Sequence, residues 1–164
     1  FRRVLFRSVN TTIDVRVLEY QANKLQELIS ELHNCCKERY SDEAKAFKMP
    51  QAELRCLMLF EGHKYLTGIQ IAGLLEVAKS RATVIIENLE KKGLVQRSPD
   101  PNDARVKLIN LTPAGQRKVR EIEEFMFELH QQLLGQIDPA QRNGVINALE
   151  TLRSSMEAVK AQMS

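Results

Sequence analysis

The chain has 164 residues, of which 43% are hydrophobic and 27% are charged, so it can bury a core without disulfides or metal and is not a disordered chain. Its 24 Lys and Arg residues exceed its 21 Asp and Glu residues by three, an excess too small to indicate a nucleic-acid partner by itself. Three cysteines exclude a closed disulfide framework and favour a reducing compartment, and no apolar run approaches the ~20 residues of a membrane span.

The first residues, Phe1–Ser8, carry two basic clusters but no apolar stretch long enough for a signal peptide. We interpret residues 1–11 as a non-native or disordered N-terminal segment, such as a fusion or sequence-assembly remnant, and leave them out of the fold prediction. A basic arm that enters a DNA groove is the functional alternative.

A long amphipathic helix is predicted from about Thr12 to Arg39. Its apolar residues recur at alternating steps of four and three: Leu18, Ala22, Leu25, Ile29, Leu32 and Cys36. The polar stretch 41–48 is predicted to be a loop, and Pro50 suits the first turn of a second helix. We assign residues 12–48 to an N-terminal dimerisation helix and loop.

The centre of the chain has the signals of a helix-turn-helix. Thr67 and Gln70 have the spacing of a capping box, which predicts a short helix that ends near residues 75–76. After a turn, residues 80–92 form a further helix pattern with one apolar face, Ala82, Ile85, Ile86 and Leu89, and Gly93 suits a left-handed C-terminal residue.

Two short strands are predicted next, at residues 94–97 and 106–111, around a tip rich in turn-forming residues. They form a β-hairpin, the wing of a winged helix. Residues 49–112 are therefore assigned to a winged helix-turn-helix region.

Two long helices complete the chain. Thr112 is the predicted N-cap of the first with Pro113 at its first position, and Asp138-Pro139 repeats this signal for the last helix. Their narrow apolar stripes favour pairing with helices of a second chain over a monomeric bundle. We assign residues 113–164 to C-terminal dimerisation helices, and the fold class to mainly α with a small β-hairpin wing.

Several stretches together resemble the MarR-type winged helix regulators. They are Leu66–Val77, Ala78–Thr83, Leu89–Val95, the wing Arg97–Arg105 and its exit Leu111–Gly115. The resemblance implies a homodimer on a pseudo-palindromic double-stranded operator, with the recognition helix in the major groove and the wing arginine in the minor groove. It further implies transcriptional control in a prokaryotic cytoplasm, by repression as the base-rate expectation, relieved by a small-molecule effector or an oxidant.

The recognition helix offers six candidate DNA contacts: Lys79, Ser80, Arg81, Thr83, Val84 and Asn88. Short hydroxyls near a helix N-terminus can bind phosphate, whereas Arg81 can read guanine, Asn88 adenine and Val84 a thymine methyl group. Solvated surface residues are the alternative. Family members often carry basic residues where this chain has Val84 and Asn88, which predicts a shallower salt dependence of binding.

In the wing, Asp103 and Arg105 resemble a carboxylate that orients a minor-groove arginine, and an exposed ion pair is the alternative reading. Arg97 and Lys107 flank the hairpin as candidate phosphate contacts. Ala104 replaces an arginine that many family members carry. Residues 79–107 hold seven cations against four carboxylates, so the excess charge of the chain is concentrated in this region.

The cysteines give two interpretations. Cys35 and Cys36 are candidate redox sensors, and small buried apolar residues are the alternative. His33, Cys35, Cys36, Cys56 and His63 match no metal-site spacing, so neither a metal nor a cofactor is predicted.

No phosphate loop, nucleophile elbow or zinc-protease motif is present, so an enzyme is not predicted. A helical interaction or redox-sensing adaptor that keeps the winged fold without specific DNA binding is the alternative function.

Overall fold

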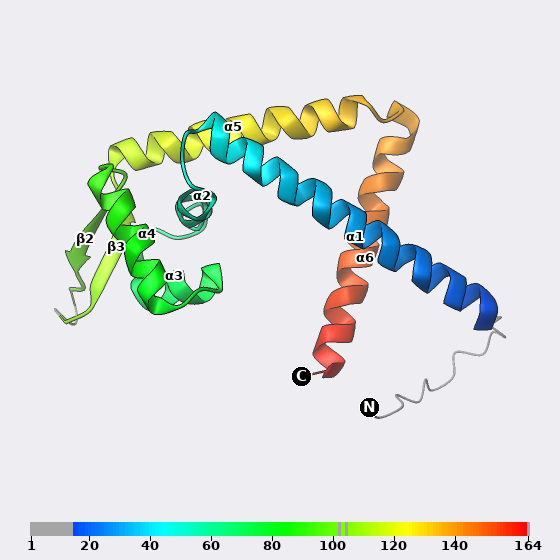
Figure 1. Cartoon of the computed structure of the whole chain (residues 1–164), viewed down its shortest axis with the longest axis horizontal. Helices are drawn as coiled ribbons and strands as arrows, with labels where there is room; N and C mark the ends of the chain where they lie inside the picture. The colour runs from blue at the N-terminus through cyan, green and yellow to red at the C-terminus, as the bar shows by residue number, and fades with distance from the viewer. Residues whose placement is uncertain (1–14, 102, 104, 164) are drawn as a thin grey trace. The chain divides into compact units, whose positions relative to one another are not determined.

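The computed structural model describes residues 15–101, 103 and 105–163, so the segment 1–11 and its predicted character lie outside the described residues. The elements in chain order are α1 (Val15–Ala46), α2 (Gln51–Met58), β1 (Leu66–Thr67), α3 (Gly68–Leu75), α4 (Lys79–Lys91), β2 (Val95–Pro99), β3 (Lys107–Leu111), α5 (Pro113–Gly135) and α6 (Pro139–Met163). Figure 1 labels all of these except β1. The predicted fold class, mainly helical with a small antiparallel sheet, is confirmed.

The chain divides into two compact units between Leu54 and Arg55, which is a boundary inside α2. The predicted domain limits at residues 48 and 112 stay predictions. The described part of the first unit consists mainly of the helix α1.

The prediction of a loop over residues 41–48 is wrong for most of that stretch, because α1 continues to Ala46. This stretch is rich in helix-forming residues, and an Arg39–Glu43 ion pair spans one turn at 3.5 Å. After the helix ends at Ala46, Lys48 takes a left-handed backbone with φ of 49°, and the N–H of Met49 bonds back to the carbonyl of Ala44.

The sheet has the order β1-β3-β2, and both pairings are antiparallel. The β2–β3 hairpin runs in register from Val95 opposite Leu111 to Pro99 opposite Lys107, which confirms the wing. β1 joins the other edge of β3 through Leu66 opposite Ile109. This strand was not predicted, because two residues are too few to show an alternating pattern.

The core of the second unit lies between α3, α4, the sheet and the start of α5. α3 packs on α4, α4 contacts β2, and α5 contacts β3. The buried apolar side chains include Leu66, Ile71, Leu75, Ala82, Ile85, Ile86, Leu89, Val95, Ile109, Val119 and Ile122. Because one face of α4 is fixed in this core, the opposite face has a defined orientation toward solvent.

Beyond its first turns, α5 becomes more exposed, and no residue of α6 is buried. Large apolar side chains on these two helices, among them Phe127, Leu133, Leu149, Met156 and Val159, are more than half exposed. In the described part of the chain, none of the helices has the length and apolar character needed to cross a membrane.

Candidate nucleic-acid interface

The helix before the candidate recognition helix begins with the predicted capping box. The N–H of Gln70 donates to the Thr67 hydroxyl at 3.2 Å, and the Gln70 side-chain oxygen accepts from the N–H of Thr67 at 2.8 Å. This reciprocal pair fixes the start of α3. The helix ends at Glu76, which has a left-handed backbone with φ of 56°.

The candidate recognition helix, α4, begins without a side-chain cap. Ala78 occupies the N-cap position, and its side chain forms no cap hydrogen bond. The N–H groups of the first turn form the positive end of the helix dipole. The side chain of Ala78 gives them no capping partner. At the other end, Gly93 has φ of 68°, as predicted for a left-handed residue after the helix.

The two faces of α4 differ sharply in burial. Its apolar face is fully buried through Ala82, Ile85, Ile86 and Leu89. Outside this face the exposed residues are Lys79, Ser80, Arg81, Thr83, Val84, Glu87 and Lys91, so five of the six predicted contacts are accessible to solvent. The sixth, Asn88, is half-buried. Whether these residues contact DNA stays a prediction.

In the wing, Asp103 shapes the turn through the backbone. Its Oδ1 accepts from the N–H of Arg105 at 2.9 Å, and its carbonyl accepts from the N–H of Val106 at 2.9 Å. Asp103 thus contacts the backbone of Arg105, whereas the sequence predicted that its carboxylate would orient the guanidinium group of Arg105. The Arg105 side chain is exposed, as is that of Lys107, whereas Ala104 lies outside the described residues.

Arg97, the remaining predicted phosphate contact, lies on β2 and reaches back to α4. Its Nη1 is 3.4 Å from Oε2 of Glu90, and both side chains are about one-third exposed, at 35% and 38%. Such a pair contributes little to stability, so the guanidinium can exchange this partner for a phosphate at small cost.

The cysteines are free thiols in three different environments. Cys35 is exposed, Cys36 is half-buried and Cys56 is buried. Within the described ranges, no cluster of three or more His, Cys, Asp or Glu residues has the geometry to hold a metal ion.

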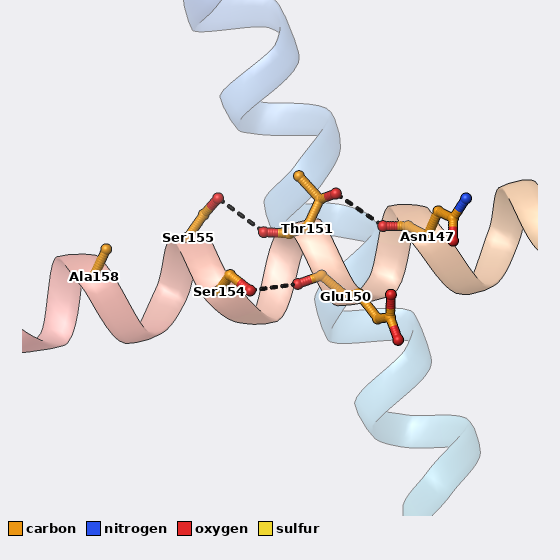
Figure 2. Close-up of a pocket in the computed structure, with 6 residues that line it drawn as sticks. All are labelled: Asn147, Glu150, Thr151, Ser154, Ser155 and Ala158. Carbon is orange, nitrogen blue, oxygen red and sulfur yellow. Dashed lines mark hydrogen bonds between the residues drawn. The ribbon is translucent and has the colours of Figure 1, made fainter.

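A shallow hollow of about 610 Å³ lies on one face of α6, and Figure 2 shows the six residues that line it. The hydroxyls of Thr151, Ser154 and Ser155 donate to the carbonyls one turn earlier, at 2.8, 3.0 and 2.9 Å. Because these protons are engaged within the helix, the hollow offers no activated nucleophile.

Comparisons with known proteins agree with this geometry. The model of the MarR family matches residues 49–107, which run from α2 through β2 to the first residue of β3. The HTH-type transcriptional regulator YdgG of Bacillus subtilis (strain 168) is 32% identical over 83 residues, or 49% of this chain and 55% of the relative. The chain spans about half the length of the first curated relatives that it matches.

Two solved structures resemble the fold over most of the chain. A MarR family protein from Bacillus stearothermophilus has a TM-score of 0.76 at 20% identity, covering 85% of this chain and 97% of its own. A mutant of MepR from Staphylococcus aureus bound to an oligodeoxyribonucleotide has a TM-score of 0.60 at 22% identity, covering 80% and 97%. At these identities, the likeness establishes the fold.

Proposed function

We propose that the chain is a member of the MarR family, whose model matches residues 49–107, and that it is a sequence-specific DNA-binding regulator of transcription, not an enzyme. The single observation that carries the proposal is the exposed face of α4, which is rigidly presented by a buried apolar face on the same helix. A major groove about 12 Å wide admits one α-helix, and side chains on its outer face can then reach the base edges.

The wing supplies the second contact in this proposal. Arg105 extends from the tip of the hairpin into the adjacent minor groove, where a planar charged group suits the negative potential. Arg97 and Lys107 contact phosphates on either side. The concentration of seven cations against four carboxylates in residues 79–107 supports this placement.

The regulator is proposed to act as a homodimer in the cytoplasm, on a pseudo-palindromic operator. Support comes from the exposed apolar surface of α6, where a hollow of about 430 Å³ is lined by Leu149, Leu152, Arg153, Met156, Glu157 and Lys160. A second copy that covers this surface removes apolar area from water. Two recognition helices then lie about 34 Å apart, one turn of DNA.

Repression released by a small ligand or an oxidant completes the proposal. A small change between the two recognition helices prevents simultaneous docking in consecutive grooves. Cys35 is the accessible thiol for an oxidant, with Cys36 beside it.

The test is selection of bound duplexes from a random pool by the purified full chain, with its mass in solution measured by sedimentation. Enrichment of a palindrome by a dimer supports the regulator. A dimer that enriches no sequence instead supports the interaction or redox adaptor, for which the neutral residues Val84 and Asn88 on α4 are the favouring observation. A strict monomer at micromolar concentration contradicts the dimeric reading.

A further inference from the structure

Glu87 is the acidic residue of the exposed α4 face, and it has no role in the function proposed above. At 100° per residue, Ser80, Val84, Glu87 and Lys91 fall on the line opposite the buried face of the helix. Glu87 therefore lies at the middle of the surface that faces the major groove in a docked complex, whereas Asn88 lies at its edge.

The surroundings of Glu87 differ from those of its neighbour Glu90. Glu90 is half-buried on the flank of α4 and pairs with Arg97 at 3.4 Å. Glu87 is exposed, and among the described residues no side-chain hydrogen bond or ion pair engages it. Its carboxylate therefore makes no hydrogen bond or ion pair within the described residues and is available to a ligand.

A carboxylate at this place restricts what it can contact. It only accepts hydrogen bonds, and phosphate groups repel it. On the floor of the major groove, the donors are the N4 amino group of cytosine and the N6 amino group of adenine. The adenine donor lies between two acceptors that repel a carboxylate, N7 of the same base and O4 of the paired thymine, whereas the cytosine donor has an acceptor on one side only, O6 of the paired guanine.

We propose that Glu87 is a specificity-determining residue that accepts a hydrogen bond from the N4 amino group of a cytosine, so that each operator half-site carries a C·G pair at one fixed position. This inference rests on the proposed DNA-binding function. It also accounts for a negative charge at the centre of a face whose other charges are positive.

The spacing along α4 places this C·G pair relative to a second base. Val84 lies three residues before Glu87 on the same line, a rise of about 4.5 Å along the helix axis. That distance is close to one base step of ~3.4 Å. If Val84 contacts a thymine methyl group, the T·A pair is expected next to the C·G pair.

The experiment compares the wild-type chain with Glu87→Gln and Glu90→Gln. Duplex selection first identifies the bound site. Binding titrations then measure the affinity of each protein for this site and for versions in which the C·G pair is replaced. Both variants remove one negative charge from the same helix, so Glu90→Gln controls for the change in charge. For the wild type and Glu90→Gln, replacing the C·G pair is expected to weaken binding about tenfold. For Glu87→Gln, the penalty is expected to fall below about threefold, because an amide both donates and accepts.

The outcomes separate the inference from the function on which it rests. A chain that selects no sequence overturns the proposed DNA binding itself. A chain that selects a palindrome without a fixed C·G pair, or in which Glu87→Gln keeps the wild-type penalty, overturns the role of Glu87 and leaves the regulator intact. Loss of the penalty in both variants assigns the effect to charge and also overturns it.

Discussion

The hydroxyl of Thr112 donates to the carbonyl of Gly93 at 2.6 Å and accepts from the N–H of Gly115 at 3.0 Å. The backbone N–H of Thr112 also donates to the carbonyl of Leu94 at 3.0 Å. One residue thus connects the end of α4 and the start of β2 to the first turn of α5. The helix that leads to the proposed dimer surface on α6 is therefore tied to the segment that directly follows the helix proposed to read DNA.

Thr112→Val is expected to lower the free energy of unfolding by about 1–2 kcal/mol, because it removes the N-cap acceptor and the donor to Gly93 together. Urea unfolding measures the change. Thr151→Val on α6 is the matched control, since that exposed hydroxyl bonds only to the carbonyl of Asn147 within its own helix. Equal small effects of the two substitutions would contradict the linking role.

Gly115→Ala is expected to destabilise the chain by more than about 2 kcal/mol, as overpacking against a backbone does. A Cβ at this position would lie 1.9 Å from the carbonyl oxygen of Leu94, so α5 would have to move away from the start of β2. Gly144→Ala in α6 is the control, because a Cβ there meets nothing within 4 Å. It is expected to stabilise by roughly 0.5–1 kcal/mol. Thermal unfolding checks this prediction: the melting temperature is expected to fall for Gly115→Ala and to rise for Gly144→Ala.

Arg105→Ala is expected to weaken binding to a selected operator by at least ~1 kcal/mol, about fivefold, while the sedimentation of the protein is unchanged. Its backbone N–H already fixes the turn through Asp103 at 2.9 Å, so the substitution removes the side chain and keeps the wing. Arg55→Ala removes the same charge from the exposed side of α2 and serves as the control. Unchanged binding of Arg105→Ala in a gel-shift titration would remove the wing from the mechanism.

Sequence reasoning succeeded where a residue type forms its own local hydrogen bonds. The capping box at Thr67 and Gln70, the N-cap at Thr112 and the left-handed Gly93 are all found where they were predicted. Each signal is short-range, so one stretch of sequence specifies it. The buried face of α4 was also predicted, because its apolar spacing is complete.

Sequence reasoning failed where the deciding interaction is not local or not typical. The end of α1 carries buried Glu43 in place of an apolar residue, so periodicity gave no helix signal there. The end of α3 near residues 75–76 was predicted, but the left-handed backbone of Glu76 was not, because glycine usually marks that conformation. In the wing, Asp103 bonds to a backbone N–H, a choice that residue spacing does not distinguish from an ion pair.

Ala78→Ser is expected to stabilise the chain by about 1 kcal/mol, because the hydroxyl would accept from an N–H in the first turn of α4, which has no side-chain cap from Ala78. Urea unfolding measures the gain, and Ala78→Gly, which adds no acceptor of its own, is the control. A serine variant no more stable than the glycine variant would show that the first turn already has another partner.

Asn88→Arg is expected to steepen the salt dependence of DNA binding. Asn88 is half-buried at the edge of the exposed α4 face, and a long arginine side chain from that edge reaches the phosphates that flank the groove. Each added phosphate contact changes the slope of log Kobs against log salt by about −0.9, so one contact per subunit adds roughly that amount for each half-site. Binding titrations at several salt concentrations measure the slope. Asn143→Arg, which adds the same charge to an exposed position near the start of α6, should leave it unchanged. Equal slopes for wild type and Asn88→Arg would mean that this edge of α4 does not lie against the DNA backbone, and the predicted docking of α4 would have to be rotated about its axis.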